Sequence, residues 1–213
     1  MEKEEVRRIA VRAACVRLAQ EKQYHVPAAV SARHIHLCAA DRDALFGAGY
    51  ALTPMRALSQ PGQYACEEKL AVVGPKGRME GVRVLGPERP DTQVELSMSD
   101  AIALGIAPNV RMSGDIAGTP GCTLAGPKGE VTLNRGVIVA ARHLHMSAQE
   151  AAVYSLKSGD AVGVRKGGVR AAVLGNVVVR AGDAHALEVH LDTDEANAAG
   201  IQTGDLLELI KDF

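Results

Sequence analysis

The sequence predicts a mainly β fold made of two similar small β-barrels, with short helical inserts and an N-terminal amphipathic helix. Two observations lead to this fold class. From residue 30 onward, short runs rich in valine and isoleucine are separated by glycine, proline and aspartate, as is typical of barrel or sandwich strands. The chain also contains an internal repeat, which indicates two similar units. Only 3% of the 213 residues are aromatic, so aliphatic side chains must fill the barrels.

Residues 1–22 form the first predicted element, an amphipathic helix, and Pro27 ends any helical pattern. The apolar side of this helix carries Val6, Ile9, Ala10, Ala13 and Val16. We expect this side to pack against the rest of the chain or against a second subunit. A detachable docking or targeting helix is the alternative.

Strands, hairpin loops and short helices are predicted after this helix. The clearest strand runs are residues 70–73, 82–85, 131–133, 137–139 and 177–179. Two copies of the tetrapeptide Gly-Pro-Lys-Gly, at 74–77 and 126–129, each join two apolar runs and predict hairpin loops. Serine or aspartate caps and alanine-rich stretches predict short helices at 39–45, 97–104, 147–154 and 192–199.

The internal repeat has two parts. Residues 32–37 and 141–146 share the pattern Ala-Arg-His-apolar-His-apolar, at an offset of 143 − 34 = 109. Residues 94–101 match residues 189–196 at an offset of 190 − 95 = 95. The offsets differ by 14 residues, so one half carries an insertion.

Composition excludes several classes of protein. Lys and Arg number 24 against 25 Asp and Glu, so the basic excess of a nucleic-acid binder is missing. No run approaches the roughly 18 apolar residues of a membrane span, and the N-terminus is charged. The four cysteines show no Cys-x-x-Cys pairing, which fits a reducing compartment. We expect a cytoplasmic protein with no nucleic-acid or membrane partner.

The histidines of the repeat indicate a metal site. Residues i and i+2 of a strand share a face, so His34 and His36 present two imidazoles side by side, as do His143 and His145. One such pair is more often a surface or core pair without a ligand. Two pairs in the same frame favour metal binding.

The second part of the repeat adds one ligand to each half, because Glu95 occupies the position that His190 occupies in the other half. Imidazole and carboxylate without thiolate suit zinc, while Fe, Ni, Co and Cu remain open. Six ligands are too many for one catalytic zinc but suit two ions bridged by a carboxylate. Glu95 is the only carboxylate of the six, so we assign it the bridge.

Two further residues are candidates for binding phosphate, which a metal pair often orients. Arg89 lies in the proline-flanked turn 86–90 and presents a planar cation for phosphate, although a turn arginine is more often a solvated charge. Ser113 opens a loop at 113–121 that is rich in glycine and hydroxyl groups. From composition alone, an ordinary connection between strands is at least as good an interpretation of this loop as an anion-binding loop.

At these residues the chain resembles the PduL-type phosphate propanoyltransferases, zinc-dependent phosphotransacylases linked to bacterial microcompartments. The matching segments are residues 30–37, 58–63, 84–87, 92–95, 113–115, 141–146 and 190–197. The resemblance implies two β-barrels, one formed by residues 23–32 plus 141–213 and the other by residues 33–140, after the helix at 1–22. It also implies a dinuclear zinc site, with Glu95 on both ions. His34 and His36 would hold one ion, and His143, His145 and His190 the other.

The same resemblance implies a role for Arg89 in binding phosphate and a place in the site for Ser113. The implied reaction is the reversible conversion of a short-chain acyl-CoA, propanoyl-CoA or acetyl-CoA, and phosphate into acyl phosphate and free coenzyme A. Members of this family that lie inside bacterial microcompartments carry an encapsulation helix at the position of residues 1–22, which would dock to the shell, whereas other members carry a different short helix there. Residues 1–22 are amphipathic enough for either. The sequence does not decide whether the protein forms a homo-oligomer.

Two other functions remain open. A dizinc hydrolase of a phosphate ester or thioester would use the same metal site with water as the nucleophile. A non-enzymatic module with structural zinc is the other alternative, although such sites are usually closed by four ligands that include cysteine.

Overall fold

The computed structural model describes residues 3–107 and 109–213, so the first two residues of the helix predicted at 1–22 lie outside the described residues. The described chain is mainly β, with 39% of residues in strands and 22% in helices. It divides into two compact units. Unit 1 comprises residues 1–31, 59–61 and 141–213, and unit 2 comprises residues 32–58 and 62–140.

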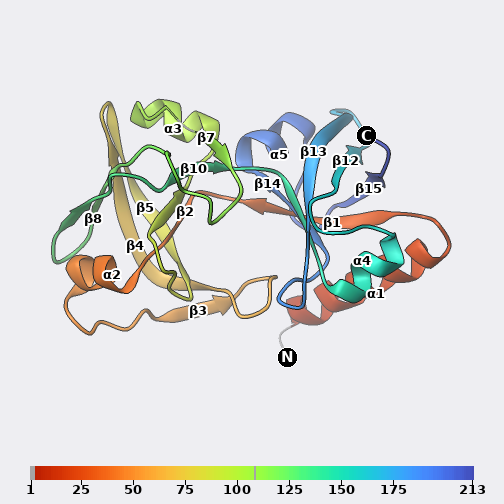
Figure 1. Cartoon of the computed structure of the whole chain (residues 1–213), viewed down its shortest axis with the longest axis horizontal. Coiled ribbons are helices and arrows are strands. Elements are labelled where there is room, and N and C mark those ends of the chain that lie inside the picture. Colours follow the sequence, from red (N-terminus) through yellow and green to blue (C-terminus); the bar gives the residue numbers. More distant parts are fainter. Residues whose placement is uncertain (1–2, 108) are drawn as a thin grey trace. The chain divides into compact units, whose positions relative to one another are not determined.

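Unit 1 is a closed six-stranded barrel with the strand order β1-β14-β11-β13-β12-β15, in which β15 pairs with β1 to complete the ring. Its strands are β1 (His25–Ser31), β11 (His143–Met146), β12 (Ala161–Lys166), β13 (Ala172–Ala181), β14 (Glu188–Asp192) and β15 (Leu206–Ile210). Its helices are α1 (Lys3–Gln20), α4 (Ala148–Tyr154) and α5 (Thr193–Ala199). Helices α1 and α4 lie side by side (Figure 1).

Unit 2 is built on a nine-stranded sheet with the order β7-β10-β6-β2-β5-β4-β8-β9, to which β3 adds by pairing with β4. Its strands are β2 (His34–His36), β3 (Pro54–Ala57), β4 (Tyr64–Gly74), β5 (Gly77–Gly86), β6 (Gln93–Glu95), β7 (Asn109–Arg111), β8 (Thr123–Ala125), β9 (Glu130–Thr132) and β10 (Val137–Ala140). Its helices are α2 (Ala39–Phe46) and α3 (Met98–Leu104).

The duplication predicted from the sequence extends to strand pairing. The order β1-β14-β11-β13-β12 in unit 1 corresponds to the order β10-β6-β2-β5-β4 in unit 2. In both units the strand with two histidines pairs in parallel with one neighbour, β13 or β5, and antiparallel with the other, β14 or β6. The repeated sequence therefore encodes a repeated five-stranded arrangement.

The prediction of two similar small β-barrels is not confirmed, because among the described residues only unit 1 forms a closed barrel. There, β15 pairs with both β12 and β1 and so closes the ring. In unit 2 the two places beside β4 and β10 are taken by different strands: β8 pairs with β4 and with its own hairpin partner β9, while β7 pairs with β10. The hairpin loop at 126–129 places β9 against the edge of β8 that faces away from β4. Closure of a barrel would need this edge of β8, so the described strands of unit 2 form an extended sheet.

The four predicted short helices and both predicted hairpin loops are confirmed. Ser97, Ser147 and Asp192 cap the starts of α3, α4 and α5 through hydrogen bonds to backbone N–H groups, as expected for residues that satisfy the unpaired donors of a first turn. The loop at 74–77 joins β4 to β5, and the loop at 126–129 joins β8 to β9.

The face of α1 that packs on its unit differs from the predicted one. Val6 and Ile9 are 46% and 50% exposed, whereas Cys15 and Ala19 are buried in the core of unit 1. Of the predicted apolar side, only Val16 packs against that core. Arg12 lies on the same side of α1 as Cys15 and Ala19, and its guanidinium donates to Leu187 O and Ser59 O. No helix within residues 3–107 and 109–213 is both long enough and apolar enough to cross a membrane.

Candidate metal centres

The first candidate centre lies in unit 2 and contains His34, His36 and Glu95. Strands β2 and β6 place His34 directly opposite Glu95 in an antiparallel register. His34 Nε2 is 3.5 Å from Glu95 Oε2, and His36 Nε2 is 3.9 Å from Glu95 Oε1. All three residues are buried, and one potential ligand atom from each lies within 4.8 Å of the others. This is a donor set of two imidazoles and one carboxylate, as zinc sites use.

The electrostatics of this centre keep Glu95 ionised. Burial alone would raise the pKa of Glu95, but the neighbouring His34 and His36 and the Ser113 hydroxyl outweigh it and hold that pKa well below its usual value. Burial and the adjacent His34 lower the pKa of His36 to about 3. A carboxylate and a neutral imidazole are the forms of these side chains that bind a metal ion.

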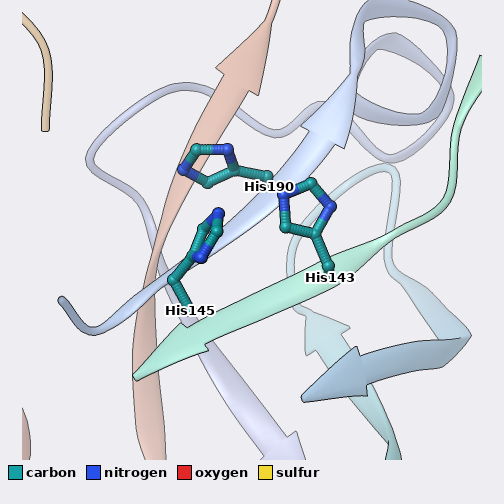
Figure 2. A group of neighbouring side chains, drawn as sticks. All are labelled: His143, His145 and His190. Carbon is teal, nitrogen blue, oxygen red and sulfur yellow. The ribbon is translucent and has the colours of Figure 1, made fainter. Parts of the chain in front are cut away.

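The second candidate centre lies in unit 1 and contains His143, His145 and His190. Here β11 and β14 place His143 opposite His190, the same register that joins His34 to Glu95 in unit 2. Figure 2 shows the three imidazoles turned toward a common space, with ring centroids 4.7 to 5.0 Å apart. Burial and the nearby imidazoles lower the pKa of His145, so this side chain is neutral. Three imidazoles form a donor set that zinc enzymes use.

The two centres hold their first histidine in the same way. His34 Nδ1 lies 2.9 Å from the carbonyl oxygen of Ala32, and His143 Nδ1 lies 2.8 Å from that of Ala141. A carbonyl oxygen can only accept, so Nδ1 carries a proton, and in the neutral ring Nε2 is the nitrogen that keeps a lone pair. Such contacts to the remote ring nitrogen fix the tautomer of a metal-binding histidine. Both donor sets therefore fit a zinc ion in residue type and in the orientation of these rings.

The predicted residues Arg89 and Ser113 lie against the first centre. Arg89 donates from Nη1 to Ser113 Oγ over 2.9 Å, and the Ser113 hydroxyl donates to Glu95 Oε1 over 2.7 Å. The backbone N–H of Arg89 donates to Leu37 O just beyond β2, which fixes the turn that carries the guanidinium. A half-buried cation is thus held beside a buried carboxylate.

Sequence reasoning missed three polar residues that contact the predicted ligands: Gln93, Glu188 and His185. Gln93 Nε2 lies 2.7 Å from Glu95 Oε1, and Glu188 Oε2 lies 2.9 Å from His190 Nε2. His185 Nδ1 lies 3.0 Å from His145 Nδ1. The repeat contained a signal for the first two, because 188 − 93 = 95 is the offset that relates His190 to Glu95. Nothing in the repeat pointed to His185.

The fold and these centres define a class of protein: a duplicated mainly β chain in which each unit carries three side chains suited to one metal ion. Comparison with known proteins makes the class specific. The family model described as phosphate propanoyltransferase matches residues 27–202. The phosphate propanoyltransferase of Thermotoga maritima is 50% identical over 85% of this chain and 87% of its own length. The phosphate propanoyltransferase of Rhodobacter capsulatus is 49% identical over 87% of this chain and 86% of its own length. That of Klebsiella pneumoniae is 50% identical over 86% of this chain and 87% of its own length.

The chain belongs to the phosphate propanoyltransferase family and is an enzyme of the phosphotransacylase type.

Proposed function

We propose that this enzyme transfers a short-chain acyl group, propanoyl or acetyl, reversibly between coenzyme A and inorganic phosphate, with zinc held by the two candidate centres. The observation that carries the proposal is the pair of three-ligand groups in equivalent frames, buried except for the partly exposed His190, one of them with Arg89 and Ser113 beside it. His34, His36 and Glu95 would hold one ion, and His143, His145 and His190 the other. The bridge by Glu95 between two ions stays a prediction.

Bound zinc would supply Lewis acidity and positive charge near an anionic substrate. Arg89 would bind phosphate through its planar guanidinium, which suits two phosphate oxygens at once. Ser113 would hold this guanidinium in place, because its hydroxyl accepts from Arg89 while donating to Glu95. A group held in this way stabilises developing charge without reorganising during the reaction.

In the proposed reaction a phosphate oxygen attacks the thioester carbonyl carbon, the new carbon–oxygen bond forms and the carbon–sulfur bond breaks. The products are acyl phosphate and the thiolate of coenzyme A, which takes up a proton. No covalent intermediate with the enzyme is needed, because phosphate is itself the nucleophile.

The test measures coenzyme A release and acyl phosphate formation from acyl-CoA substrates of increasing chain length, with and without phosphate. We expect release to require phosphate and to match acyl phosphate in amount. Release without phosphate would instead identify a hydrolase. Arg89→Ala should abolish most turnover while the bound metal is retained, and Arg78→Ala, which removes an exposed arginine of the same unit paired with Glu80, should leave turnover unchanged.

We also propose that residues 1–22 dock the enzyme to a microcompartment shell. The exposed Val6 and Ile9 on α1 support this role, since they form an apolar surface that unit 1 does not cover. A reporter protein fused to residues 1–22 should be recovered with shells, and Val6→Ser with Ile9→Ser should release it. Exclusion of the unaltered fusion from shells would contradict the proposal.

A further inference from the structure

The third ligand of each candidate centre is preceded, two residues earlier on the same strand, by a buried polar side chain. Gln93 precedes Glu95 on β6, and Glu188 precedes His190 on β14. Residues i and i+2 of a strand point to the same face, so each polar side chain lies beside its ligand. Gln93 is 2% exposed and Glu188 is 4% exposed, so their contacts are shielded from water.

In unit 2 the side chain at this position is a donor that faces a carboxylate. Gln93 Nε2 donates to Glu95 Oε1 over 2.7 Å and to Ser113 Oγ over 2.9 Å. The orientation of the amide is fixed from its other end, because Gln93 Oε1 accepts from the backbone N–H of Gly114 over 2.8 Å. The amide therefore presents its N–H groups, and not its oxygen, to Glu95.

In unit 1 the side chain at the equivalent position is an acceptor that faces an imidazole. Glu188 Oε2 lies 2.9 Å from His190 Nε2, where a carboxylate oxygen accepts a hydrogen bond from the ring nitrogen. In this pairing Nε2 is the donor, and Nδ1 is the nitrogen left to bind a metal ion. Ser59 Oγ and Gln60 Nε2 donate to the same carboxylate oxygen, and the guanidinium of Arg12 lies 4.0 Å from the other one.

We propose that Gln93 and Glu188 are matched positioning residues, which hold the third ligand of each centre in its metal-binding orientation. The duplicated position has changed together with its ligand: an amide donor accompanies the carboxylate Glu95, and a carboxylate acceptor accompanies the imidazole His190. Hydrogen-bonded partners of this kind orient metal ligands, and their loss typically weakens metal binding by about 10–100-fold.

Exchanging the residue types at positions 93 and 188 would remove or weaken the contact that each side chain makes with its metal ligand. Glutamate at position 93 would set one carboxylate against another over a distance of 2.7 Å and would remove the donor to Glu95. Glutamine at position 188 would still offer an amide oxygen to His190 Nε2 but would lose the negative charge. The inference rests on the proposed function, because it requires that the two centres bind metal ions.

The experiment measures metal binding by the full-length protein, stripped with a chelator and then titrated with Zn²⁺ against a competing indicator. The absorption spectrum of bound Co²⁺ is recorded in parallel. The wild type should bind two ions. Glu188→Ala should weaken one of the two binding steps by about 10–100-fold and leave the other unchanged, and Gln93→Glu should weaken the step that depends on Glu95 by a similar factor. Glu188→Gln should restore part of the loss seen in Glu188→Ala, and it preserves side-chain shape if Glu188→Ala folds poorly.

Matched controls are Glu208→Gln in unit 1 and Glu80→Gln in unit 2, which change exposed carboxylates paired with surface arginines. Both should bind two ions as the wild type does, with the same Co²⁺ spectrum. Unchanged affinity and spectrum in folded Glu188→Ala, Glu188→Gln and Gln93→Glu would overturn the inference while leaving the proposed function intact. A wild type that binds no metal would overturn both.

Discussion

Arg33 donates a hydrogen bond from Nε to Asp100 Oδ2 over 2.9 Å, and this pair has a counterpart in the other unit, where Arg142 Nε lies 2.5 Å from Glu195 Oε1. Each arginine directly precedes the first histidine of a candidate centre. Each carboxylate lies on the helix that follows the strand of the third ligand, α3 or α5. The repeat therefore includes an ion pair. In each unit this pair links the residue before the His-x-His strand to the helix that follows the strand of the third ligand.

Replacing these arginines should destabilise the protein to different extents. Arg142 also donates from Nη1 to Gly175 O over 2.8 Å, so Arg142→Met removes two hydrogen bonds and should lower the free energy of unfolding by about 1–3 kcal/mol. Arg33→Met removes one contact of a side chain that is 45% exposed, and about 0.5–1 kcal/mol is expected.

Urea denaturation of both variants gives these free energies. Arg165→Met is the control, because Arg165 and Glu208 form an exposed pair whose loss should cost less than about 1 kcal/mol. Equal effects for all three variants would show that the paired arginines have no special part in holding the strands.

Removal of the metal should lower thermal stability as well as activity. The centres bring imidazoles and the carboxylate Glu95 together in largely buried positions, which an unfolded chain does not do, so bound ions stabilise only the folded state. At a free zinc concentration of 100 times the dissociation constant, one site contributes about 2.7 kcal/mol. A chelator should therefore lower the melting temperature, and added Zn²⁺, but not Mg²⁺, should restore it. A melting temperature insensitive to the chelator would contradict the prediction.

The sequence predicted those features of the fold and centres that depend on local pattern or on the repeat. The short helices followed from caps such as Ser97 and Ser147, and the candidate ligands followed from duplicated His-x-His frames. Barrel closure could not be predicted, because it depends on whether β15 or β8 finds a partner far away in the chain. Which side of α1 packs on unit 1 could not be predicted for a similar reason, since helical periodicity does not reveal that Arg12 bonds to Leu187 O and Ser59 O.

The four cysteines should differ in reactivity. Burial raises the pKa of Cys15 and Cys66 to about 11 and that of Cys122 to about 12, so these thiols are protonated at pH 8, whereas the thiolate is the reactive form. Cys38 is only partly buried. Brief treatment with iodoacetamide at pH 8 should label Cys38 first, and mass spectrometry of peptides should find the other three labelled only after unfolding. Early labelling of Cys122 would show that its surroundings open readily.

The two Gly-Pro-Lys-Gly loops bind the ends of helices in unit 2. The backbone N–H of Lys76 donates to Leu104 O at the end of α3, and that of Lys128 donates to Leu45 O near the end of α2. The first glycine of each loop allows this close approach. A Cβ atom on Gly74 would lie 2.4 Å from Leu104 O, and one on Gly126 would lie 2.7 Å from Leu45 O.

Alanine at either first glycine should therefore force the loop away from its helix and lower the free energy of unfolding by about 1–3 kcal/mol. Alanine at the last glycine is the matched control, because a Cβ atom on Gly77 or Gly129 would lie 3.1 Å from the nearest backbone oxygen and needs a much smaller shift. Urea denaturation should rank Gly74→Ala and Gly126→Ala as clearly less stable than Gly77→Ala and Gly129→Ala. The reverse order of stability would mean that the close approach of each loop to a helix end is not the reason for glycine at its first position.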